Sequence, residues 1–144
     1  QGAIIDLTCG MTGSAIPVPH AVKQALDAGV PLERLTLSSD GNGSMPKFNE
    51  NNELIGLTAA APRYLYEEML SIVKAGVLPF DKALQLITCN VADALKLEDK
   101  GRIAVGKDAD LIVWNDDLTL NKVFARGRLM VDEGQAVVKG TFEN

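Results

Sequence analysis

Residues 36–46, TLSSDGNGSMP, contain the side chains of this chain that are best suited to chemistry. Asp40 follows a short apolar run, and Gly41 and Gly43 come directly after it. Catalytic groups collect at the carboxyl ends of parallel strands, where a carboxylate can accept a proton or bind a metal ion, and glycine lets the backbone approach a ligand closely. Asp-Gly and Asn-Gly are also common turn dipeptides, so the spacing alone leaves an ordinary turn equally open.

Other candidate groups are few. His20 is the only histidine, and a binuclear zinc site needs several histidine or carboxylate ligands. Beside Pro19, at the start of an expected helix, His20 is more simply a surface or capping residue. Ser38, Ser39 and Ser44 have no histidine on their own segment, so we expect no catalytic triad.

The elements that must position Asp40 read as strand, helix, strand. An apolar run over 3–8 predicts a buried strand, helical spacing predicts a helix over 19–28, and residues 33–40 contain a second strand. In one sheet this order gives a parallel pair with a right-handed crossover. The expected fold class is therefore α/β.

Residues 41–62 are expected to form a long loop, which is a frequent carrier of function, although disorder is the competing interpretation. An amphipathic pattern then predicts a helix over 64–75. Its expected buried stripe comprises Leu65, Met69, Ile72 and Val73. Pro79 is expected to begin a helix that runs to about residue 88, and Asn90 to cap a short helix over 91–95.

The character of the chain changes from Gly101 onward. Short runs of Val, Ile and Leu each end at Gly, Asn or Asp, which is typical of antiparallel sheet. FARGRLMVDEG predicts a hairpin around Gly127. The change predicts two domains, residues 1–97 and residues 98–144.

The composition is that of a globular protein: 144 residues, 47% hydrophobic and 23% charged, with a net charge of −5. Without a clustered basic face we expect no nucleic-acid partner, and without a long apolar run no membrane partner. Cys9 and Cys89 are expected to be free thiols in a reducing cytoplasm. Because the chain opens at Gln1 inside a strand-like run, we expect a piece of a longer protein; a tag remnant before Gly2 is the alternative.

Three stretches resemble the amidohydrolase superfamily. GRIAVGKDADLIVWN, residues 101–115, resembles the point where such chains leave their barrel and complete a small β-sandwich. LTLSSDGNGSMP resembles the eighth-strand segment of the bacterial isoaspartyl (β-aspartyl) dipeptidases, and FARGRLMVDEGQAVVKGTFE is similar to their C-terminus. The resemblance implies the C-terminal part of a (β/α)8 TIM-like barrel, strands 7 and 8 with their helices, followed by part of a small β-sandwich.

The resemblance also implies an activity, namely zinc-dependent hydrolysis of β-aspartyl dipeptides by the complete protein. Asp40 matches the family aspartate that ligates one of two zinc ions and passes a proton from the bridging hydroxide to the leaving amine. Ser44 matches the serine that hydrogen-bonds the substrate, and Gly41 and Gly43 allow the substrate to approach. The other family ligands have no counterpart here, so we expect the isolated fragment to bind no zinc pair and to be inactive.

Two further functions stay open: a non-catalytic remnant or assembly module of the same fold, and an amidohydrolase that acts on another amide or a cyclic amide. An incomplete barrel leaves the edge of the strand at 3–8 unpaired, and such edges pair with other chains. We therefore expect a homo-oligomer.

Overall fold

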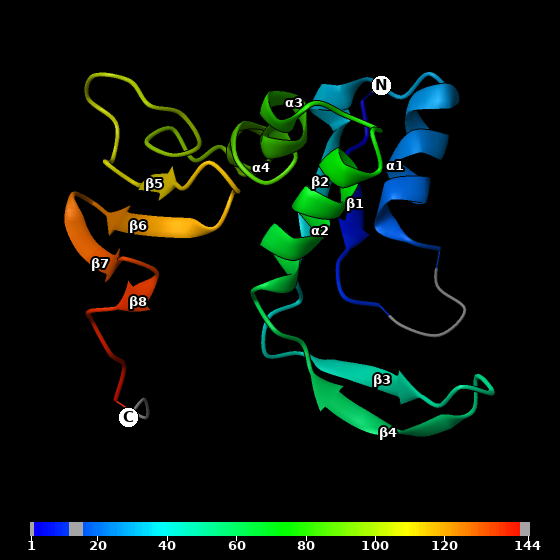
Figure 1. Cartoon of the computed structure of the whole chain (residues 1–144). Helices are drawn as coiled ribbons and strands as arrows, with labels where there is room; N and C mark the ends of the chain where they lie inside the picture. Colours follow the sequence, from blue (N-terminus) through cyan, green and yellow to red (C-terminus); the bar gives the residue numbers. More distant parts are fainter. Residues whose placement is uncertain (1, 12–15, 142–144) are drawn as a thin grey trace. The chain divides into compact units, whose positions relative to one another are not determined.

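The computed structural model describes residues 2–11 and 16–141, which divide into two compact units between Lys96 and Leu97 (Figure 1). The first unit contains helices and strands, and the second contains a sheet. Their assignment as barrel and sandwich portions stays a prediction. Within the described residues, no helix combines the length and the apolar character that crossing a membrane requires.

The first unit begins with a parallel pair of strands. β1 (Ile5–Thr8) pairs with β2 (Leu35–Ser38) in the register Ile5↔Leu35 to Thr8↔Ser38. Helix α1 (Val18–Asp27) and a short 3-10 turn at 32–34 connect the two strands. The predicted strand–helix–strand order and the parallel pairing are confirmed.

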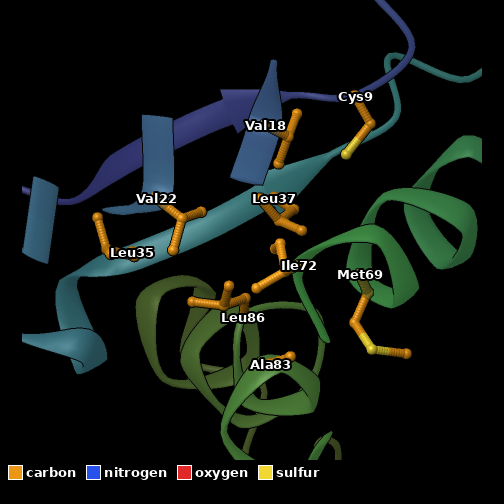
Figure 2. Packing of buried hydrophobic residues seen from close by; sticks show 9 residues of the cluster. All are labelled: Cys9, Val18, Val22, Leu35, Leu37, Met69, Ile72, Ala83 and Leu86. Atoms are coloured by element: carbon orange, nitrogen blue, oxygen red, sulfur yellow. The ribbon is translucent and has the colours of Figure 1, made fainter. Parts of the chain in front are cut away.

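One face of this strand pair packs against helices. Leu35 and Leu37 point from β2 toward α1, α2 (Tyr64–Lys74) and α3 (Phe80–Gln85), and Figure 2 shows the side chains that gather there. The buried cluster comprises Cys9, Val18, Val22, Leu35, Leu37, Met69, Ile72, Ala83 and Leu86. Met69 and Ile72 are fully buried, while Leu65 and Val73 pack against the cluster as half-buried residues. The predicted stripe of α2 is therefore confirmed.

The predicted helix over 91–95 is present, but its start was predicted wrongly. Helix α4 runs over Cys89–Leu95, so Asn90 lies inside the first turn and is almost fully buried. Its side-chain amide donates hydrogen bonds to the backbone oxygens of Leu32, at 2.8 Å, and Leu35, at 2.9 Å. Asn90 thus ties α4 to the start of β2 and does not cap the helix.

The predicted long loop over 41–62 is wrong, because most of it is a β-hairpin. β3 (Ser44–Phe48) and β4 (Leu54–Ala59) pair antiparallel, with an irregularity at Lys47/Phe48. Pro46 and Gly56 lie inside these strands, and both residue types normally argue against a strand. The connecting turn is closed by the Asn49 side chain, whose oxygen accepts the backbone N–H groups of residues 51 and 53.

The second unit is a four-stranded antiparallel sheet. Its strands lie in the order β5 (Leu111–Trp114), β6 (Leu120–Ala125), β7 (Arg128–Asp132) and β8 (Gln135–Ala136). The predicted hairpin around Gly127 is confirmed as the β6–β7 turn. Arg126 and Gly127 there have φ of +49° and +76°, as a two-residue type I′ turn requires.

The GKDADLIV motif has a structural role in this second unit. Lys100 pairs with both Asp108 and Asp110. Asp108 also lies 3.2 Å from the Arg126 guanidinium, and Asp110 accepts the Arg126 backbone N–H at 2.7 Å. The hydrogen bonds from Lys100 hold the pKa of both carboxyl groups below the usual value. The two aspartates therefore fasten the β6–β7 turn to the start of β5.

Candidate active site at the carboxyl end of the parallel strands

Asp40 lies two residues beyond the end of β2 and is exposed. Its backbone has φ of +46°, and Asn42 follows with φ of +66°. Left-handed backbone at residues other than glycine costs on the order of 1–3 kcal/mol each and clusters at active sites. The turn is held by hydrogen bonds from Gly43 N–H to Asp40 O, at 2.7 Å, and from Asn42 N–H to Ala60 O, at 2.9 Å. The backbone that presents Asp40 is thus fixed from both sides.

The two glycines of this turn differ in what surrounds them. A Cβ atom on Gly43 would lie 2.8 Å from the carbonyl oxygen of Asp40, which is closer than real Cβ contacts. A Cβ atom on Gly41 would lie 3.1 Å from Cγ of Pro62. The turn therefore needs glycine at position 43. That either glycine admits the substrate stays a prediction.

Ser44 is the first residue of β3 and is exposed. It pairs with Ala59 on β4, and the backbone N–H of Ala60 donates to Gly43 O at 2.8 Å. Ser44 is thus carried by a paired strand directly after the Asp40 turn, where the sequence alone placed it on a loop.

Asp6 is a polar group of this region that the sequence analysis missed. Its carboxylate on β1 accepts hydrogen bonds from the hydroxyls of Thr36, at 2.7 Å, and Ser38, at 2.5 Å, both on β2. These side chains lie on the face of the strand pair opposite Leu35 and Leu37, since neighbouring residues of a strand point to opposite faces. The only signal in the sequence was a single carboxylate in the apolar run AIIDLT.

Cys9 follows β1 and is not a nucleophile in this arrangement. Its side chain is fully buried. Burial, and secondarily the negative charges of Glu68 and Asp6, raise the pKa of the thiol to about 12. The reactive thiolate is therefore scarce at neutral pH.

A cavity of about 250 Å³ lies beside the hairpin that carries Ser44. It is lined by Gly10, Met45, Pro46, Lys47, Thr58 and Tyr64. Gly10 is needed there, because a Cβ atom at this position would lie 2.2 Å from the Tyr64 ring. The cavity thus joins the end of β1, the hairpin and the start of α2.

A zinc ion in a protein takes about four donors, and the described residues do not supply such a set. In residues 2–11 and 16–141, no three His, Cys, Asp or Glu side chains form a group that could hold a metal ion. His20 is exposed on α1, and Asp6 is engaged by two hydroxyls. Asp40 can at most contribute one ligand to a site that other residues complete.

A parallel strand pair backed by helices, with a carboxylate beyond its carboxyl end, is an arrangement of α/β proteins, in which barrels and open sheets both bind ligands at this edge. The chain belongs to the amidohydrolase family, whose sequence profile matches residues 19–134. Members of this family are hydrolases.

Relatives by sequence include adenine deaminase 1 of Carboxydothermus hydrogenoformans, 28% identical over 104 residues, which are 71% of this chain and 17% of that protein. The imidazolonepropionase of an Anaeromyxobacter species is 36% identical over 92 residues, which are 64% of this chain and 18% of that protein. The chain thus spans less than a fifth of the length of these relatives.

Two solved structures resemble the fold of this chain over nearly its whole length. The β-aspartyl dipeptidase of Fervidobacterium islandicum AW-1, in complex with β-Asp-Leu, matches 97% of this chain and 36% of its own, with a TM-score of 0.81 and 30% identity. The N-acetylglucosamine-6-phosphate deacetylase of Thermotoga maritima covers 90% of this chain and 39% of its own, with a TM-score of 0.66 and 18% identity. The predicted fold class, barrel segment followed by a sheet-rich portion, is confirmed.

Proposed function

We propose that the protein to which this chain contributes is an isoaspartyl dipeptidase, which hydrolyses the amide bond of β-aspartyl dipeptides. The observation that carries the proposal is the likeness to the Fervidobacterium β-aspartyl dipeptidase over 97% of the chain. The adenine deaminase and imidazolonepropionase relatives cover smaller shares, 71% and 64%. The likeness to the dipeptidase therefore extends over a larger share of the chain.

In this proposal Asp40 is the residue that moves the proton. Its exposed carboxylate accepts a proton from the attacking water and returns it to the leaving amine, so that the amide bond breaks without releasing an amine anion. The fixed backbone at Asp40 supports this role, because the hydrogen bonds of the turn hold residue 40 in one position beyond the end of β2.

Ser44 is the proposed substrate-binding residue. Its hydroxyl can donate a hydrogen bond to a carboxylate of the dipeptide, and its backbone is held by the pairing of β3 with β4. Gly41 and Gly43 leave Asn42 as the only residue with a side chain between Asp40 and Ser44. The substrate is thus held by one end of the turn while Asp40 acts at the other.

Enzymes of this family are typically metal-dependent, and we propose two zinc ions in the complete protein, with Asp40 as one ligand and the others outside the described residues. The described residues alone do not form such a site. We therefore expect the isolated 144-residue chain to bind no zinc pair and to be inactive.

We also propose that the complete protein is a cytoplasmic homo-oligomer that binds neither nucleic acid nor membrane. Cys9 and Cys89 are free thiols, which supports a location in the reducing cytoplasm.

A second candidate, a non-catalytic module of the amidohydrolase fold, is favoured by the same lack of a metal-binding cluster in the described part of the chain. The test that separates the candidates is an assay of the native gene product, with its metal content measured, on β-Asp-Leu, α-Asp-Leu, adenine and a cyclic amide. Release of leucine from β-Asp-Leu alone is the expected result. Deamination of adenine or opening of the cyclic amide would overturn the dipeptidase assignment, and a metal-free protein inactive on all four would favour the module.

A further inference from the structure

A single carboxylate bridges two side chains of β2 on the face that points away from the apolar cluster. One oxygen of Asp6 accepts the hydroxyl of Thr36 at 2.7 Å, and the other accepts the hydroxyl of Ser38 at 2.5 Å. Hydrogen bonds to an ionised carboxylate are shorter and stronger than those between neutral groups. Because Thr36 lies directly opposite Asp6, the bond to Ser38 runs diagonally toward the carboxyl end of the strand pair. Asp6 therefore holds the end of β2 as well as its middle.

Ser38 is the last residue of β2, and Asp40 follows it two residues later. The backbone oxygen of Ser38 also accepts the N–H of Cys9 at 2.7 Å, so that both the main chain and the side chain of Ser38 are bound to the segment that contains β1. On the other side of Asp40, the hydrogen bond from Gly43 N–H to Asp40 O closes the turn. A displacement of Ser38 therefore reaches Asp40 through one intervening residue, Ser39.

We infer that Asp6 is a positioning residue for Asp40: it holds the end of β2 through Ser38 and so fixes where the carboxylate of Asp40 is presented. Asp6 acts through Ser38 and is not itself a catalytic residue. The inference rests on the proposed proton-transfer role of Asp40. It assigns to Asp6 an effect on turnover and not on binding, because the proposed substrate-binding residue, Ser44, lies beyond the turn on a separately paired strand. Small displacements of a catalytic group can lower the rate strongly.

Steady-state kinetics of the whole protein on β-Asp-Leu test the inference. Asp6→Ala and Ser38→Ala each remove the hydrogen bond between Asp6 and Ser38, so each should lower kcat on the order of tenfold while KM stays nearly unchanged. If both changes act through this one bond, the double variant should lose little more than Asp6→Ala alone. All variants are compared at equal folded fraction and equal metal content, so that a loss of stability is not counted as a loss of turnover.

Two variants serve as matched controls. Thr36→Val removes the other hydrogen bond of Asp6 and leaves the bond to Ser38, so kcat should fall much less than in Ser38→Ala. Asp6→Asn keeps the size of the side chain, and its oxygen can accept one hydroxyl while its amide donates to the other. This variant should therefore restore most of the turnover that Asp6→Ala loses. A merely structural role would instead give losses of turnover that follow the losses of stability.

Hydrogen exchange of the whole protein supplies a readout that does not depend on the substrate. In Asp6→Ala and Ser38→Ala the amides of residues 41–44 should exchange on the order of tenfold faster, because the turn opens more often. The amides of residues 49–53, at the far end of the β3–β4 hairpin, should exchange as before (Figure 1).

Three results would overturn the inference: near-normal kcat in Ser38→Ala, additive losses in the double variant, or exchange at residues 41–44 that stays unchanged or rises equally with that at 49–53. A whole protein that does not hydrolyse β-Asp-Leu would instead overturn the proposed function. The exchange measurement would then decide by itself whether Asp6 holds the Asp40 turn.

Discussion

The carboxylate of Asp6 on β1 accepts a 2.7 Å hydrogen bond from the hydroxyl of Thr36, the residue directly opposite it on β2. Thr36 is nearly buried, so its hydroxyl depends on this acceptor, because a buried donor without a partner is costly.

We predict that Asp6→Ala lowers the free energy of unfolding by about 1–3 kcal/mol. Thr36→Val removes the hydroxyl while keeping the shape of the side chain and should have a smaller effect. Chemical denaturation of both variants and of the double variant measures the interaction free energy between Asp6 and Thr36. We expect a value of about 1 kcal/mol, because the two side chains are in contact. Strictly additive effects would mean that the bond contributes nothing.

Asp40→Asn and Ser44→Ala should separate turnover from binding in the whole protein. Asp40→Asn keeps the size of the side chain but cannot accept a proton, so kcat should fall on the order of a hundredfold or more. Ser44→Ala should mainly raise KM, by the loss of one hydrogen bond of about 1.5–3 kcal/mol, since the backbone of β3 is held by its pairing with β4. Steady-state kinetics on β-Asp-Leu with the metal content checked measures both. Near-normal turnover of a fully metallated Asp40→Asn enzyme would contradict the proton-transfer role.

Gly43→Ala should disturb the Asp40 turn more than Gly41→Ala does. The new methyl group at 43 would lie 2.8 Å from a backbone oxygen that cannot move without opening the turn, whereas the one at 41 meets a proline side chain at 3.1 Å. We expect a loss of about 1–3 kcal/mol for Gly43→Ala and a clearly smaller loss for Gly41→Ala. Denaturant melts of the two variants compare them. Equal losses would show that the contact with Asp40 O is relieved at little cost.

Cys9 should make the stability of the chain fall at alkaline pH. Its thiol has a pKa of about 12 in the folded chain against an ordinary value of 9.0, so the folded state favours the protonated form. That stabilisation is complete below pH 9 and is lost as the pH rises from about 9 toward 12. Cys9→Ala should flatten this part of the stability curve, and Cys89 should react first with a thiol reagent at pH 8. Rapid labelling of Cys9 in the folded chain would contradict its burial.

Local patterns in the sequence determined many of the elements correctly. The strand–helix–strand order, the buried Met69 and Ile72 of α2 and the hairpin at Gly127 all follow from periodicity or turn residues within a dozen positions. The β3–β4 hairpin escaped prediction because Pro46 and Gly56 mask a strand pattern that only pairing with the other strand stabilises.

In the candidate site, too, some residues could be found from local sequence signals and others only from tertiary contacts. Asp40 and its glycines could be selected from the sequence, because a carboxylate after a strand and before a glycine-rich turn is a local signal. Asp6 could not be selected, nor could the true role of Asn90 in the fold be found, because the partners of Asp6 lie 30 and 32 residues away and those of Asn90 lie 58 and 55 residues away. Such contacts exist only once β1, β2 and α4 pack together. The sequence by itself therefore indicated which groups are chemically suited to a reaction, and the tertiary structure decided which groups hold the strands and helices around them in place.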